Sequence, residues 1–171
     1  IERDPDNRTA RLVRALSALK ATDYDRAIGE IDAAAPGPFT ALVGTLAKAW
    51  AMAGKQDAEQ AYAALDSFQD RPAFDLFRIL HGALIADYLG DAARARTGYV
   101  AAQGASGGAS LRIIQAYGRF LERQDDTELA REVYNNYGRL APDHPIIANA
   151  LARLETGVAP PSLVKTPAEG L

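Results

Sequence analysis

The stretch "TDYDRAI", Thr22 to Ile28, decides the fold because its pattern returns along the chain. A polar turn with an aspartate leads into an alanine, Ala27, and the alanines Ala61, Ala95 and Ala130 follow at intervals of 34, 34 and 35 residues. This spacing alone is weak evidence, because about one residue in five of the chain is alanine. When the chain is aligned on these four alanines, the residues at the other aligned positions, or columns, must therefore show whether one unit is repeated.

Three further columns share this register. Large apolar residues stand four positions after the alanine, at Ile31, Leu65, Tyr99 and Tyr134. Small residues stand twelve positions before it, at Ala15, Ala49, Ala83 and Gly118, and apolar residues stand nine positions before it, at Ala18, Met52, Ala86 and Leu121. One inserted residue near "GASGG" at 104–108 keeps every column in register. The chain is thus predicted to hold four copies of one unit, at about 8–41, 42–75, 76–110 and 111–144.

Each copy is predicted to be a helical hairpin. Alanine favours helices, Gly90 ends one helix, and Asp91 is a natural N-cap for the next. The pair Asp125–Asp126 is interpreted as the corresponding capping turn of the fourth copy. A single hairpin cannot bury its apolar face, so the copies must stack into an all-α solenoid. The expected helices are about 8–20, 24–34, 39–53, 58–68, 73–88, 92–102, 109–123, 127–139 and 145–155.

On these residues the chain resembles the tetratricopeptide repeat (TPR) family. The best matches are "TDYDRAI" and "ELAREVYNNYGRLAPDHP", Glu128 to Pro145, where Ala130, Tyr134 and Pro142 fall at the family's alanine, aromatic and proline positions. The resemblance implies a right-handed α-solenoid of four hairpins that binds other proteins. The chain departs from the family at its early helix-A tryptophan and the following leucine, which are replaced by Arg11, Thr45, Ile79 and Ile114, and by Arg14, Lys48, Gly82 and Tyr117.

The end of the chain has a different pattern. Residues 145–156 are predicted to form an amphipathic capping helix on the last copy, and residues 157–171 a proline-rich tail, read as an extended linker or the entry to a further domain. Because the chain begins at Ile1, we interpret it as part of a longer bacterial protein. The compartment, periplasm or cytoplasm, stays open.

Composition narrows the function classes. The net charge is −3 and the pI about 5.4, which argues against nucleic-acid binding, including the RNA binding of the related pentatricopeptide repeats with their 35-residue period. No apolar run approaches the roughly 20 residues of a transmembrane helix. The chain has no cysteine, which excludes disulfides, thiol catalysis and cysteine-ligated metals.

The candidate partner surface is the inner, concave side, which the first helix of each hairpin lines in this architecture. Helical spacing places an apolar wall on the first three copies and charged residues on the fourth. The predicted groove residues are Leu12, Leu16, Leu46, Trp50, Phe77, Leu80, Leu84, Arg112 and Arg119. A leucine stripe at helical spacing equally fits ordinary core packing. The arginine row, with Arg123, fits a solvated face or a docking point for an acidic group.

Catalysis has little support in the sequence. The two histidines, His81 and His144, have no second histidine at ligand spacing, and no phosphate-binding glycine loop is present. We therefore expect no enzyme, no cofactor and no metal. The predicted function is a scaffold that binds a peptide or helix of another protein in an apolar concave groove. The alternative is a structural or oligomerisation module that supports a neighbouring domain. Under either reading the groove could face a peptide, a second copy of the chain, or its own tail "APPSLV".

Overall fold

The structure, a computed structural model, describes residues 7–34 and 37–160. These residues form nine α-helices and one short 3-10 helix, and they contain no strand. The predicted all-α fold class is therefore confirmed. The helices are α1 (Arg8–Lys20), α2 (Tyr24–Asp32), α3 (Pro38–Gly54), α4 (Ala58–Asp66), α5 (Asp75–Tyr88), α6 (Ala92–Ala105), α7 (Leu111–Arg123), α8 (Thr127–Leu140) and α9 (Pro145–Thr156), with the 3-10 helix η1 (Pro72–Phe74) before α5.

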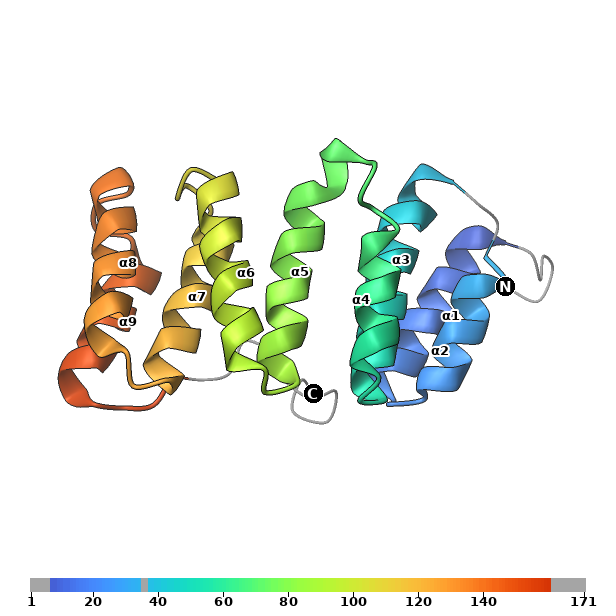
Figure 1. Ribbon diagram of the computed structural model, residues 1–171, viewed down its shortest axis with the longest axis horizontal. Helices are drawn as coiled ribbons and strands as arrows, with labels where there is room; N and C mark the ends of the chain where they lie inside the picture. Colours follow the sequence, from blue (N-terminus) through green and yellow to red (C-terminus); the bar gives the residue numbers. More distant parts are fainter. Residues whose placement is uncertain (1–6, 35–36, 161–171) are drawn as a thin grey trace.

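The helices pack as successive antiparallel hairpins in chain order (Figure 1). The extensive contacts join α1 to α2, α3 to α4, α5 to α6 and α7 to α8, while α9 packs on α8. Each second helix also contacts the first helix of the next pair. This packing of hairpins is consistent with a TPR-like solenoid.

The turn inside each hairpin is the same structure four times. The residue five positions before the repeat alanine has a left-handed backbone: Thr22 (φ 60°), Gln56 (φ 63°), Gly90 (φ 81°) and Asp125 (φ 58°). Its N–H and that of the next residue donate to the carbonyls three and five residues back, as from Thr22 to Leu19 and from Asp23 to Ala18. These two bonds satisfy the last carbonyls of the first helix and reverse the chain.

The aspartate that follows this turn begins the second helix. The carboxylates of Asp23, Asp57 and Asp91 each accept a hydrogen bond from the backbone N–H three residues on, at 3.0 to 3.2 Å. The fourth copy differs from the expectation, because the side chain of Asp126 makes no capping bond. It accepts instead from Arg96 Nη1 at 2.9 Å, so a cation on α6 has replaced the helix end as its partner.

Small residues set how closely the two helices of a hairpin approach. A Cβ added to Gly118 would lie 2.2 Å from the ring of Tyr134, and one added to Gly98 would lie 2.8 Å from the Cβ of Ala83. These helices touch where a side chain is missing. The repeat alanines at 27, 61, 95 and 130 are fully buried in the same interfaces.

The buried core of the described chain is uneven along its length. One continuous cluster runs from α5 to α9 and includes the aromatic side chains of Tyr99, Phe120 and Tyr134. The first two hairpins hold three smaller clusters, built largely from alanines. The second half therefore buries larger side chains in a single core.

Two sequence expectations need correction or lie outside the described chain. The first helix of the third copy begins at Asp75 and not near Ala73, because Pro72 to Phe74 form the 3-10 turn η1. The fixed φ of Pro72 suits the start of such a turn. Of the predicted proline-rich tail, residues 161–171 lie outside the described residues.

Candidate functional site

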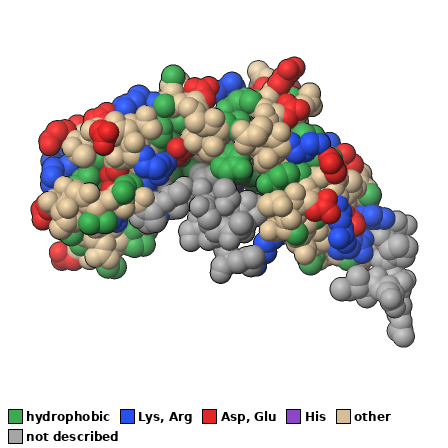
Figure 2. Space-filling model, turned by 90° about the horizontal axis from the view of Figure 1, so that it is seen from below, with side chains coloured by type: hydrophobic (Ala, Val, Ile, Leu, Met, Phe, Trp, Pro, Cys, Tyr) green, Lys and Arg blue, Asp and Glu red, His purple; other side chains and the backbone are tan. Residues whose placement is uncertain are grey.

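The first helices of the hairpins form one row. Contacts join α1 to α3, α3 to α5 and α5 to α7, whereas no comparable contact joins successive second helices in the described chain. A row of helices that approach more closely lies on the inner side of a curve. Figure 2 shows the described part bent as an arch, with hydrophobic side chains near the middle of its span. We call the surface of α1, α3, α5 and α7 on this inner side the first-helix face.

The predicted apolar wall divides into exposed and buried members. Leu16 is 48% exposed and Phe77 is 44% exposed, while Leu46 and Trp50 are half-buried. These four side chains keep surface that a partner can reach.

Three of the predicted groove leucines are covered. Leu12, Leu80 and Leu84 are at most 7% exposed. Leu80 and Leu84 belong to the large core, together with Ile113 and Ile114 of α7. Their burial places them in the packing between neighbouring helices, beneath the exposed members.

A polar pair lies among the apolar residues of this face. The indole N–H of Trp50, on α3, donates to Nδ1 of His81, on α5, at 2.9 Å. The Trp50 ring also makes edge contacts with His81 and Tyr88, with ring centroids 6.2 and 5.9 Å apart. Burial lowers the pKa of His81 to about 4, with a further contribution from the positive charge of Arg112. The imidazole is therefore neutral near pH 7 and can accept this bond.

The predicted arginines lie on α7, at the next position along the row. Arg112 is exposed and Arg119 is half-buried. Burial lowers the pKa of Arg119, and the nearby charge of Arg153 on α9 lowers it further. The first-helix face therefore passes from apolar on α3 and α5 to basic on α7.

Two carboxylates, the part-buried Asp87 and the buried Glu122, each hold an arginine in place. Asp87 accepts from the Tyr99 hydroxyl at 2.9 Å and from Arg123 Nη2, and burial together with Asp87 raises the pKa of Tyr99. Glu122 repeats the arrangement one hairpin later. It accepts from the Tyr134 hydroxyl at 2.6 Å and from Arg153 Nη2 at 3.0 Å.

The sequence analysis did not recognise these carboxylates, although a signal exists. The residue twelve positions before each large apolar column member is Asp87 for Tyr99 and Glu122 for Tyr134, but Leu19 for Ile31 and Ala53 for Leu65. A carboxylate therefore stands at this position only in the two copies whose large apolar residue is a tyrosine, which has a hydroxyl to donate. Each carboxylate bonds a tyrosine of the second helix in its own hairpin and an arginine of the helix that begins the next unit. The two carboxylates therefore connect neighbouring units.

The two histidines have structural partners. His144 begins α9, and its Nδ1 accepts from the N–H of Ile146 at 3.3 Å. Within residues 7–34 and 37–160 no three His, Asp or Glu side chains converge in a way that could hold a metal ion. No helix in the same ranges has the length and apolarity needed to cross a membrane.

Comparison with known proteins finds one family match, in the last part of the chain. Residues 111–154, which span α7, α8 and most of α9, match the tetratricopeptide repeat family. The fourth hairpin and the helix that follows it are therefore similar to a tetratricopeptide repeat. The TPR match covers the hairpin with Gly118, Ala130 and Tyr134, the columns from which the repeat was predicted. No curated protein and no solved structure matches the chain. TPR units are non-catalytic repeats that generally mediate protein–protein interaction, and this is the class of function that the match supports.

Proposed function

We propose that this protein is a scaffold that binds a peptide or helix of another protein along its first-helix face. The carrying observation is the exposure of Leu16 and Phe77 beside the half-buried Leu46 and Trp50, all on one row of helices. Apolar side chains scattered singly on a surface need no explanation, but apolar side chains aligned on successive helices provide a continuous contact for a partner. No catalytic step is part of the proposal.

The arginines would set the direction in which the partner lies. The apolar positions lie on α1, α3 and α5, and Arg112 and Arg119 lie on α7. An acidic group at one end of a bound segment would meet them. Exposed ion pairs add little affinity but favour one orientation over its reverse.

The experiment compares substitutions on the two sides of the solenoid. Phe77→Glu and Leu46→Glu should abolish capture of the protein's partners while the far-ultraviolet circular dichroism stays unchanged. Val100→Glu is the matched control, because Val100 is 52% exposed but lies on the second helix α6. Leu84 is unsuitable as a test position, because it is buried in the core.

The same variants also distinguish the scaffold from the alternative function, a module through which the chain oligomerises. If the first-helix face joins two copies of the chain, light scattering should show a concentration-dependent dimer that Phe77→Glu dissociates. A monomer that loses its partner only with the first-helix substitutions supports the scaffold. Equal loss with Val100→Glu would overturn it.

A further inference from the structure

A second concave site lies away from the first-helix face. A cavity of about 200 Å³ opens between α4, α5 and α6, where the second and third hairpins meet. Its floor is apolar and is lined by Leu65, Ile79 and Ala83 together with two glycines. Gly82 leaves space for a side chain, whereas Gly98 packs closely on Ala83. A cavity of this size suits a small molecule or one ring, since about 150 Å³ is enough to hold benzene.

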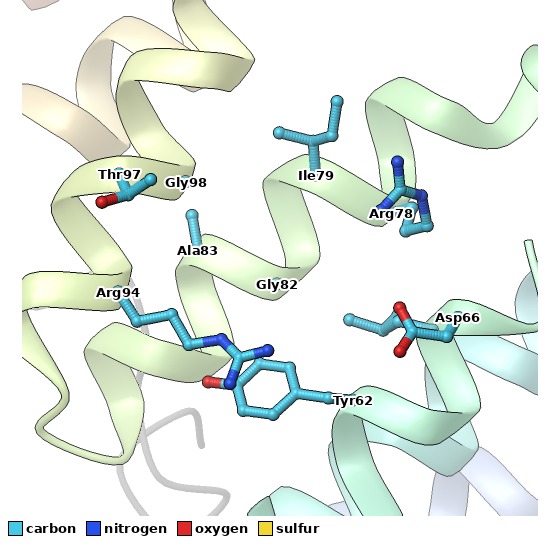
Figure 3. A pocket seen from close by; sticks show the side chains of 10 residues that line it. Tyr62, Asp66, Arg78, Ile79, Gly82, Ala83, Arg94, Thr97 and Gly98 are labelled. Atoms are coloured by element: carbon cyan, nitrogen blue, oxygen red, sulfur yellow. The ribbon is translucent and has the colours of Figure 1, made fainter. Parts of the chain in front are cut away.

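One wall of this cavity carries a cation without a carboxylate partner. The guanidinium of Arg94, on α6, lies over the ring of Tyr62, on α4, at 3.4 Å from the ring centroid (Figure 3). Among the described residues no Asp or Glu pairs with it. The stack occupies the face of the guanidinium and leaves the N–H groups at its edge available, in the planar fork that matches a carboxylate.

The same wall holds an unsatisfied hydroxyl. The Tyr62 hydroxyl oxygen is buried and has no hydrogen-bond partner in the described part of the chain. A buried polar atom without a partner is costly, so an unpaired one points to a ligand that supplies the bond. The remaining charged side chains do not compete for this wall. Arg78 contacts Asp75 at 3.4 Å, and Asp66 lies with Arg78 across the cavity from Arg94 (Figure 3).

We propose that this cavity binds a small organic carboxylate, with its apolar part over Gly82 and Gly98 and its carboxylate on Arg94 and the Tyr62 hydroxyl. The ligand contacts the second hairpin through α4 and the third through α5 and α6. It therefore ties two repeat units together at a place where the protein itself leaves a gap. This site is separate from the partner surface, and it stands whether or not that surface binds a protein.

Benzoate is the probe, because it combines one ring with one carboxylate. Titrated at constant ionic strength into the full, ¹⁵N-labelled chain, it should shift the amide signals of Gly82, Thr97 and Gly98 saturably, with a Kd in the millimolar range. Benzyl alcohol and benzylamine keep the ring without the carboxylate and should bind at least about tenfold more weakly, as expected for losing a charge-assisted hydrogen bond.

Variants assign the binding to the proposed atoms. Arg94→Gln should weaken benzoate at least about tenfold, and Tyr62→Phe, which keeps the ring beneath Arg94, should weaken it by several-fold. Arg26→Gln, at an exposed arginine of α2, is the control that should leave the affinity unchanged. Gly82→Leu should abolish binding by filling the floor, because a Cβ there meets only Leu65 Cδ1 at 3.9 Å and the helix can accept it.

Several results would overturn the site. These are benzoate shifts that do not saturate or that spread over the whole molecule, equal binding of benzyl alcohol, and unchanged affinity in Arg94→Gln or Tyr62→Phe. Circular dichroism and thermal melts of each variant confirm that a loss of binding is measured on a folded protein.

Discussion

At the scale of single residues, the left-handed position of the hairpin turns is a site of backbone strain. Gly90 suits its positive φ, but Thr22, Gln56 and Asp125 adopt the same backbone at the equivalent places. A residue with a side chain is disfavoured there by about 1 kcal/mol or more, whereas glycine is not. The turn is nevertheless kept, because its two hydrogen bonds end the first helix, and in the first three copies the following aspartate caps the next helix.

The first prediction follows from that strain. Gln56→Gly should raise the free energy of unfolding by about 0.5–1 kcal/mol, because Gln56 is exposed, has φ 63° and loses no side-chain bond. Gln60→Gly is the matched control on the exposed surface of α4, where it should lower stability by roughly the same amount. Urea unfolding measures both. Destabilisation by the two changes alike would show that the turn carries no strain.

His81 gives a pH-dependent prediction. Its pKa is about 4 in the folded chain and 6.5 without the protein environment, so between these values the unfolded state binds more protons. Stability should therefore be fully present above pH 6.5 and fall as the pH drops towards 4, by about 2–3 kcal/mol. Protonation of Nδ1 also removes the acceptor of the Trp50 indole bond.

The variant His81→Gln isolates this contribution, because glutamine can accept the indole N–H but does not titrate. Urea unfolding followed by Trp50 fluorescence at pH 7 and pH 4.5 should show a larger stability loss in the parent protein than in the variant. An identical loss in both would mean that other groups account for the acid sensitivity.

At the scale of helices, glycine has opposite roles in two equivalent second helices. In α6 a Cβ at position 98 would lie 2.8 Å from Ala83 Cβ on α5, so Gly98→Ala should force the helices apart and cost about 1–3 kcal/mol. In α2 the space beside Gly29 is open, so Gly29→Ala should stabilise the chain by about 0.5–1 kcal/mol through helix propensity. Thermal or urea unfolding compares the two. Stabilisation by both would show that α5 and α6 do not rely on this close approach.

The helices and turns were predictable because their signals are local. Column spacing located all four hairpins, and the caps at Asp23, Asp57 and Asp91 follow from residue type and position. Asp126 occupies the same place in the sequence but binds Arg96, a partner on another helix that no local pattern reveals.

The surface was harder to predict than the fold. Leu16 and Leu80 both occupy the inner register of a first helix, yet Leu16 is 48% exposed and Leu80 is 7% exposed. The difference depends on which neighbouring helix covers each one. Leu80 joins the core of the following hairpins, whereas Leu16 lies on α1, the first helix of the row. Helical spacing gives the face of a residue but does not tell how much of that face its neighbours bury.

At the scale of the whole molecule, the uneven core predicts uneven stability. In a repeat array each unit is stabilised by its own packing and by its interfaces with neighbours, so a weaker end can open without the rest. Within the described residues, α5 to α9 share one core with Tyr99, Phe120 and Tyr134, whereas α1 and α2 contribute mainly to clusters of small side chains around Ala15 and Ala18. The ion pairs of Asp87 with Arg123 and of Glu122 with Arg153 also lie in the second half.

Native-state hydrogen exchange should therefore find the slowest amides in α7 and α8 and amides at least about tenfold faster in α1 and α2, a difference of about 1.4 kcal/mol in opening free energy. Ile31→Ala, which removes the large column residue of the first hairpin, should accelerate exchange in α1 and α2 and leave α7 and α8 unchanged. Uniform protection, or acceleration of all helices together by this change, would show that the hairpins unfold as one unit. The observed gradient would instead mean that the first hairpin opens independently, which brings the exposed Leu16 of α1 into a segment free to adjust to a partner.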